Sequence, residues 1–119
     1  MTSLQAKLQQ IGSALYGALG DMVHHYYRPD GKARSVVWQE SGEDNSFHAN
    51  NTKAEQAIRG TVDYYTQTEF DSNADVIQTV LQSLGAAWSL ESVQYEEDTK
   101  FIHFEWSWII RTDGVDANG

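Results

Sequence analysis

The chain has 119 residues, of which 40% are apolar, and it carries a formal net charge of −9 and no cysteine. This length allows one compact domain, and the lack of cysteine excludes disulfide scaffolds, thiolate metal sites and cysteine nucleophiles. Acids and bases cancel in residues 1–59, so that residues 60–119 hold the whole excess of negative charge. Such an acidic half repels nucleic-acid phosphates and suits a basic partner.

The first predicted element is an amphipathic helix over residues 3–19, because its leucines and isoleucine recur every three or four positions. Ser3 is a suitable N-cap, and Gly20 is a suitable end. The opposite helix face is polar but almost uncharged, with Gln5, Gln9, Ser13 and Gly17. A face of this kind is a candidate surface for contact with another subunit.

Two strands are predicted next, over residues 23–27 and 35–40. The turn residues Arg28-Pro29-Asp30-Gly31-Lys32 between them predict a tight reversal, from which the second strand returns. The following segment, 41–51, is polar and rich in turn formers, which predicts a mobile loop with Phe47 as its apolar residue.

A long strand is predicted over residues 55–70, followed by a second helix that ends at Gly85. Ser72 and Asp75 have the spacing of a capping box at the start of this helix. Its predicted buried stripe consists of Val76, Ile77, Val80, Leu81 and Leu84.

The last two predicted strands cover residues 88–95 and 100–111 and are joined by a hairpin at Glu96-Glu97-Asp98-Thr99. The strongest strand signal is an alternating set of apolar residues, Ile102, Phe104, Trp106, Trp108 and Ile110. Residues 1–111 are therefore expected to form a single α+β domain, with 112–119 as a flexible tail. In this domain, two helices are expected to pack on a mainly antiparallel four- to five-stranded sheet.

The second face of that sheet is expected to stay partly uncovered and polar, with Tyr65, Gln67, His103, Glu105 and Ser107. Asp63 or Glu69 is expected across from His103, which leaves a metal or acid–base site as a minor alternative. The other histidines lack metal-ligand spacing, and the acidic hairpin lacks the spacing of a calcium loop. We therefore expect no catalytic residue, no metal and no cofactor.

Arg28, Lys32 and Arg34 form a basic cluster around the predicted reversal, whereas acids dominate the C-terminal half. A molecule that is basic at one end and acidic at the other can pair head to tail with copies of itself. Contacts of that kind close into rings when the rotation permits.

Several segments resemble small minor tail proteins of phages and prophages of Gram-positive bacteria. They include Val37-Trp38-Gln39-Glu40, the segment from Glu55 to Thr66, Ser92-Val93-Gln94-Tyr95-Glu96-Glu97 and His103-Phe104-Glu105-Trp106. The resemblance covers the chain from Trp38 to Ile110. The order of elements is similar to that of the tail terminator, or tail completion, fold of long-tailed phages.

This resemblance implies a hexameric ring that caps the tail tube, ends tube polymerisation and presents the head-joining surface. The implied partners are other copies of the chain, the tail-tube protein and a head-completion or connector protein. DNA only passes through the lumen, no membrane is involved, and the protein is assembled into the virion tail in the host cytoplasm. The residues expected to bind these partners are Arg28, Lys32, Arg34, Glu43, Asp44 and Phe47.

Two other functions stay open on the sequence. An acidic immunity or inhibitor protein that binds a basic partner, such as a nuclease, fits the size and charge equally well. A small hydrolase that uses His103 and Glu105 is a weaker alternative.

Overall fold

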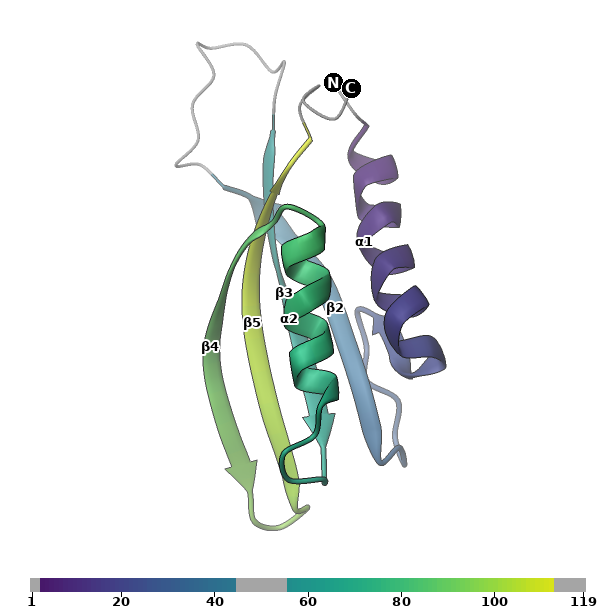
Figure 1. Ribbon diagram of the computed structural model, residues 1–119, viewed down its shortest axis with the longest axis vertical. Helices are drawn as coiled ribbons and strands as arrows, with labels where there is room; N and C mark the ends of the chain where they lie inside the picture. Colours follow the sequence, from purple (N-terminus) through teal and green to yellow (C-terminus); the bar gives the residue numbers. More distant parts are fainter. Residues whose placement is uncertain (1–2, 45–55, 113–119) are drawn as a thin grey trace.

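The computed structural model describes residues 3–44 and 56–112. Two helices lie on one face of a five-stranded sheet (Figure 1), which confirms the predicted α+β class. In chain order the elements are α1 (Leu4–Leu19), the short 3-10 helix η1 (Gly20–Met22), β1 (Val23–His25), β2 (Arg34–Glu43), β3 (Ala57–Thr66), α2 (Asn73–Ser83), β4 (Ala87–Glu96) and β5 (Phe101–Arg111). The strand order is β1-β2-β3-β5-β4, and neighbouring strands are antiparallel except for β1 and β2.

The hydrophobic core lies between the helices and one face of the sheet. Alternate residues of the central strands point into it, among them Val62 on β3 and Trp106 on β5, as the period-2 pattern predicts. Ile11 on α1 and Ile77 on α2 close the core from the other side. The alternating apolar pattern of the last strand therefore identifies the face on which both helices pack.

The predicted reversal after the first strand is wrong. β1 runs parallel to β2, with His24 paired to Val37 and His25 to Trp38, so residues 26–33 carry the chain back along the sheet edge instead of forming a hairpin. This path uses a positive φ of 82° at Tyr26, whose amide still donates to the Trp38 carbonyl oxygen at 3.0 Å. Asp30 and Gly31 do form a turn, but a local turn does not determine the direction of the next strand.

The predicted capping box at the start of α2 is also wrong. Ser72 has helical dihedrals and makes no side-chain cap bond, whereas Asp71 Oδ1 accepts the amide of Asn73 at 3.0 Å. Asp71 Oδ2 accepts the Tyr64 hydroxyl at 2.6 Å and the Thr66 hydroxyl at 2.7 Å. Because Asp71 binds both β3 and the start of α2, it fixes the helix on the sheet.

Several predicted boundaries differ from the structure; β1, for example, ends at His25 instead of residue 27. β3 ends at Thr66 instead of residue 70, and β2 extends through a bulge at Glu40–Gly42 into the predicted 41–51 loop. Thr112, expected in the tail, is buried, and its amide donates to the Gln56 carbonyl oxygen at 2.8 Å. Residues 45–51 of the predicted loop and residues 113–119 of the predicted tail lie outside the described residues.

Candidate interaction surfaces

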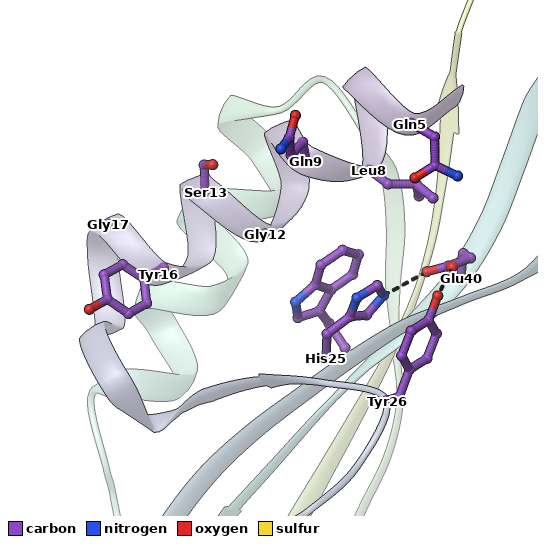
Figure 2. Close-up of a pocket in the computed structure, with 11 residues that line it drawn as sticks. Gln5, Leu8, Gln9, Gly12, Ser13, Tyr16, Gly17, His25, Tyr26 and Glu40 are labelled. Atoms are coloured by element: carbon purple, nitrogen blue, oxygen red, sulfur yellow. Dashed lines mark hydrogen bonds and ion pairs between the residues drawn. The ribbon is translucent and has the colours of Figure 1, made fainter. Parts of the chain in front are cut away.

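A groove of about 590 Å³ runs between α1 and the sheet edge formed by β1 and β2 (Figure 2). Its helix wall includes the uncharged polar face predicted from the sequence, namely Gln5, Gln9, Ser13 and Gly17. Its sheet wall consists of His25, Tyr26, Trp38 and Glu40. Gly12 allows the close approach of the two walls, because a Cβ atom there would lie 2.9 Å from Trp38 Cζ2.

The Glu40 carboxylate is held by two neighbours in this groove. His25 Nε2 lies 2.8 Å from Oε1, and the Tyr26 hydroxyl donates to Oε2 (Figure 2). Burial raises the pKa of the Glu40 carboxyl, but the hydrogen bonds from Tyr26 and His25 outweigh burial and leave that pKa below its ordinary value. The hydrogen bond to Glu40 raises the pKa of the Tyr26 hydroxyl. Glu40 therefore stays ionised near neutral pH.

The aromatic rings of the sheet wall form a stack. The ring of His25 lies 3.8 Å from that of Trp38 and 3.6 Å from that of Tyr26, centroid to centroid. The contact between Glu40 and His25 was not predictable from the sequence, because it depends on the parallel pairing of β1 with β2. The available signal was the spacing of Trp38 and Glu40, which places both on one face of β2.

The open face of the sheet carries Tyr65, His103, Glu105 and Ser107 as expected, whereas Gln67 lies in the turn after β3. His103 Nε2 lies 3.1 Å from Asp63 Oδ1, as one of the two expected pairings predicts, and the His103 ring stacks on Tyr65 at 4.3 Å. The guanidinium carbon of Arg28 lies 3.7 Å from the centroid of the Tyr65 ring. Within residues 3–44 and 56–112, no three histidine or acidic side chains are grouped so that they could hold a metal ion.

The basic residues expected to bind a partner have different surroundings. Arg28 lies against the rings of Tyr65 and Phe101, and Arg34 Nε is 3.5 Å from Asp71 Oδ2. Lys32 is exposed in the connection between β1 and β2. The three cations thus share one region, but Arg34 also has a structural contact.

The acidic members of the predicted set lie elsewhere. Glu43 ends β2, and the Asp44 amide donates to the Ala57 carbonyl oxygen at 2.7 Å. Arg34 begins the same strand, so that about 30 Å of β2 separates the two groups. The structure therefore does not bring the predicted partner-binding residues together, and Phe47 lies outside the described residues.

The charged turns share one end of the sheet instead of marking opposite ends, as the sequence had suggested. The 26–33 connection, the 67–72 turn and the 97–100 turn all lie at the lower end in Figure 1. Gln67 Nε2 donates to the Thr99 carbonyl oxygen at 2.8 Å, which links two of these turns. The basic connection also reaches toward β5, because Arg28 lies over the rings of Tyr65 and Phe101.

Strand β4 presents an exposed apolar stripe along the outer edge of the sheet. Leu90, Val93 and Tyr95 are 43%, 51% and 57% exposed, although they lie on the face that the helices cover elsewhere. In Figure 1, α2 lies in front of the central strands and leaves β4 at the margin. The sequence identified β4 as a strand but did not identify this stripe.

Phe70 is a second exposed apolar feature, in the turn between β3 and α2. Its side chain is 93% exposed, and its backbone has a positive φ of 59°, which is uncommon for a bulky residue. It belongs to the 67–72 turn, which lies at the same end of the sheet as the other charged turns. A large apolar side chain that is exposed to solvent in an outer turn is typical of a residue that anchors an interaction with another protein.

The chain matches no protein-family model and no curated protein. Among the described residues, no helix combines the length and hydropathy needed to cross a membrane. The groove, the β4 stripe and the charged turns are therefore the features from which function is inferred.

Proposed function

We propose that this chain is a structural tail assembly protein of a phage or prophage. It caps the tail tube as a hexameric ring, ends tube polymerisation and forms the surface that joins the head. The observation that carries the proposal is the uncovered stripe of Leu90, Val93 and Tyr95 on the outermost strand. Apolar residues on an edge strand favour association with another chain, and the resemblance to tail terminators supports a copy of the same chain in a ring.

The two edges of the sheet support ring closure. One edge presents the apolar stripe of β4, and the other is the short strand β1, so that neighbouring copies meet through unlike surfaces. Such heterologous contacts generate closed rings when the rotation between copies permits. The acidic turn Glu96–Asp98 and the basic connection with Lys32 share one end of the sheet. In a ring, these two segments of neighbouring copies therefore lie at the same level along the ring axis. Opposite charges then meet between neighbours.

The other proposed partners, namely the tail-tube protein, the head connector and the DNA, are assigned to surfaces outside the contacts between copies. Phe70 is almost wholly exposed in the turn between β3 and α2, where it is available to the tail-tube protein or to the head connector. The acidic C-terminal half suits a lumen through which DNA slides without binding. Assembly in the host cytoplasm and a place in the virion tail follow from this role.

Deletion of the gene from the phage or prophage that encodes it tests the proposal. Electron micrographs of the deletion should show tail tubes of uncontrolled length that fail to join filled heads, and the gene supplied in trans should restore uniform tails. Uniform, head-joined tails in the deletion would overturn the proposal.

An acidic inhibitor of a basic enzyme is the second candidate. It is favoured by the ionised Glu40 in the groove and by the acidic turn at residues 96–98. An inhibitor of this kind acts as a monomer, and its loss leaves tail length unchanged. The deletion experiment therefore separates the two functions.

A further inference from the structure

We propose that the groove between α1 and the β1–β2 edge binds a basic side chain, preferably an arginine, presented by an extended segment of another protein. This inference is independent of ring formation and rests on the charge, the aromatic faces and the hydrogen-bonding groups of the groove. Its failure leaves the tail-length experiment unaffected.

The charge of the groove selects a cation. Glu40 is the ionised residue among the described residues that line the groove, and none of these lining residues is a lysine or an arginine. Its side chain is 23% exposed, so that it can be reached from the groove. His25 binds one carboxylate oxygen of Glu40, and Tyr26 binds the other. Each oxygen keeps a further lone pair that can accept a hydrogen bond. A guanidinium can pair with these positions, whereas a phosphate is repelled.

The aromatic stack favours a planar cation. Trp38, His25 and Tyr26 lie face to face, and Tyr26, the outermost ring, is exposed to solvent. Guanidinium groups stack on such faces and are less strongly hydrated than ammonium groups. Because the stack ends beside the Glu40 carboxylate (Figure 2), one arginine side chain can contact both the ring and the charge.

The helix wall suits a peptide backbone. Gln5, Gln9 and Ser13 present amide and hydroxyl groups, which donate and accept hydrogen bonds without adding charge. The volume of about 590 Å³ lies in the range of sites that hold small ligands or single side chains with their backbone. An apolar ligand would desolvate these polar groups without replacing their hydrogen bonds.

NMR titration of the full, ¹⁵N-labelled chain with N-acetyl-arginine-N-methylamide tests the inference. The matched probe is the citrulline analogue, which keeps the shape of arginine and lacks its charge. The arginine probe should give saturable shifts at amides of α1 and of residues 25–40, and the citrulline probe should bind at least about tenfold more weakly. Equal affinities, or an absence of saturable shifts, would overturn the inference.

Two variants locate the site. Glu40→Gln should weaken binding of the arginine probe at least about tenfold, because it removes the carboxylate. Glu97→Gln makes the same charge change in the distant acidic turn and should leave binding unchanged. Equal losses in both variants would show general charge attraction and would refute a groove site. Should Glu40→Gln fail to fold, the comparison of arginine with citrulline on the wild-type chain decides alone.

Discussion

Arg34 Nε lies 3.5 Å from Asp71 Oδ2, so a cation expected to bind a partner also contacts a carboxylate that is almost fully buried. The same oxygen accepts the hydroxyls of Tyr64 and Thr66, and Oδ1 accepts the Asn73 amide. One carboxylate thus joins β2, β3 and the start of α2. This cluster fixes the end of the sheet that carries the charged turns, including the turn that contains Phe70.

Asp71→Asn should lower the free energy of unfolding at neutral pH by about 1–3 kcal/mol, because it weakens hydrogen bonds to a buried carboxylate. Burial raises the pKa of Asp71, but the hydrogen bonds from Tyr64, Asn73 and Thr66 and the charge of Arg34 outweigh burial and leave it below the ordinary 3.8. The stability from this shift is therefore present above that ordinary value and is lost as the pH falls toward the lowered pKa. Urea unfolding across the acid range measures both effects.

Asp98→Asn is the matched control for this prediction, because it makes the same change in the exposed 97–100 turn. It should leave the free energy of unfolding within about 0.5 kcal/mol of wild type. Identical acid unfolding of the wild type and Asp71→Asn would contradict the role given to Asp71.

Gly60→Ala should destabilise the fold by about 1–3 kcal/mol or more, because a Cβ atom there overlaps the Gln39 carbonyl oxygen and the ring of Trp108. Gly17→Ala is the comparison: apart from neighbouring residues and the helix's own backbone, no heavy atom lies within 4 Å of its added Cβ, and alanine favours an exposed helix position. Gly17→Ala should stabilise the chain by up to about 1 kcal/mol. Thermal unfolding of both variants should move the melting temperature in opposite directions.

Val93→Glu should block assembly without unfolding the chain, because it places a charge in the middle of the exposed β4 stripe. Gln94→Glu, the next residue on the same strand, faces the open side of the sheet opposite His103 and should assemble normally. Tail length in the complemented deletion measures assembly, and circular dichroism checks the fold. Normal tails with Val93→Glu would show that the stripe is not an interface.

Phe70→Gly separates interaction from stability. Glycine adopts the positive φ at this position without strain, and the Phe70 side chain is almost wholly exposed, so the free energy of unfolding should stay within about 1 kcal/mol of wild type. Joining of tails to heads or capping of the tube should nevertheless be impaired. A large loss of stability would contradict the view that Phe70 serves an external contact.

The fold class was predictable because its signals are periodic. The leucine spacing of α1 and the alternation from Ile102 to Ile110 identify the helix and the strand, and also the faces that they bury. The direction of β1 was not predictable, because a Pro-Asp-Gly turn serves a hairpin and a crossover alike. The cap of α2 was misassigned because Ser72 and Asp71 are both good capping residues, and only tertiary contacts with β3 select Asp71.

The candidate surfaces were predictable only in part. The uncharged face of α1 and the polar open face of the sheet follow from single-element patterns. The groove at Glu40 depends on the register of two strands, and the β4 stripe depends on how far α2 extends across the sheet. Neither relationship is encoded in the period of one segment.

Disulfide trapping between neighbouring copies tests ring assembly most directly, because the natural chain has no cysteine. Lys32→Cys and Glu97→Cys are introduced together, and tails assembled from this variant are oxidised. Oxidation of the dilute, unassembled double variant serves as the control, because it measures any disulfide that forms within one copy. A non-reducing gel should show a ladder that ends at the hexamer, while each single variant stays monomeric. Two results would contradict the proposed ring. One is a set of normal-length tails in which the double variant stays monomeric on the gel, and the other is a set of normal-length tails that lack this protein.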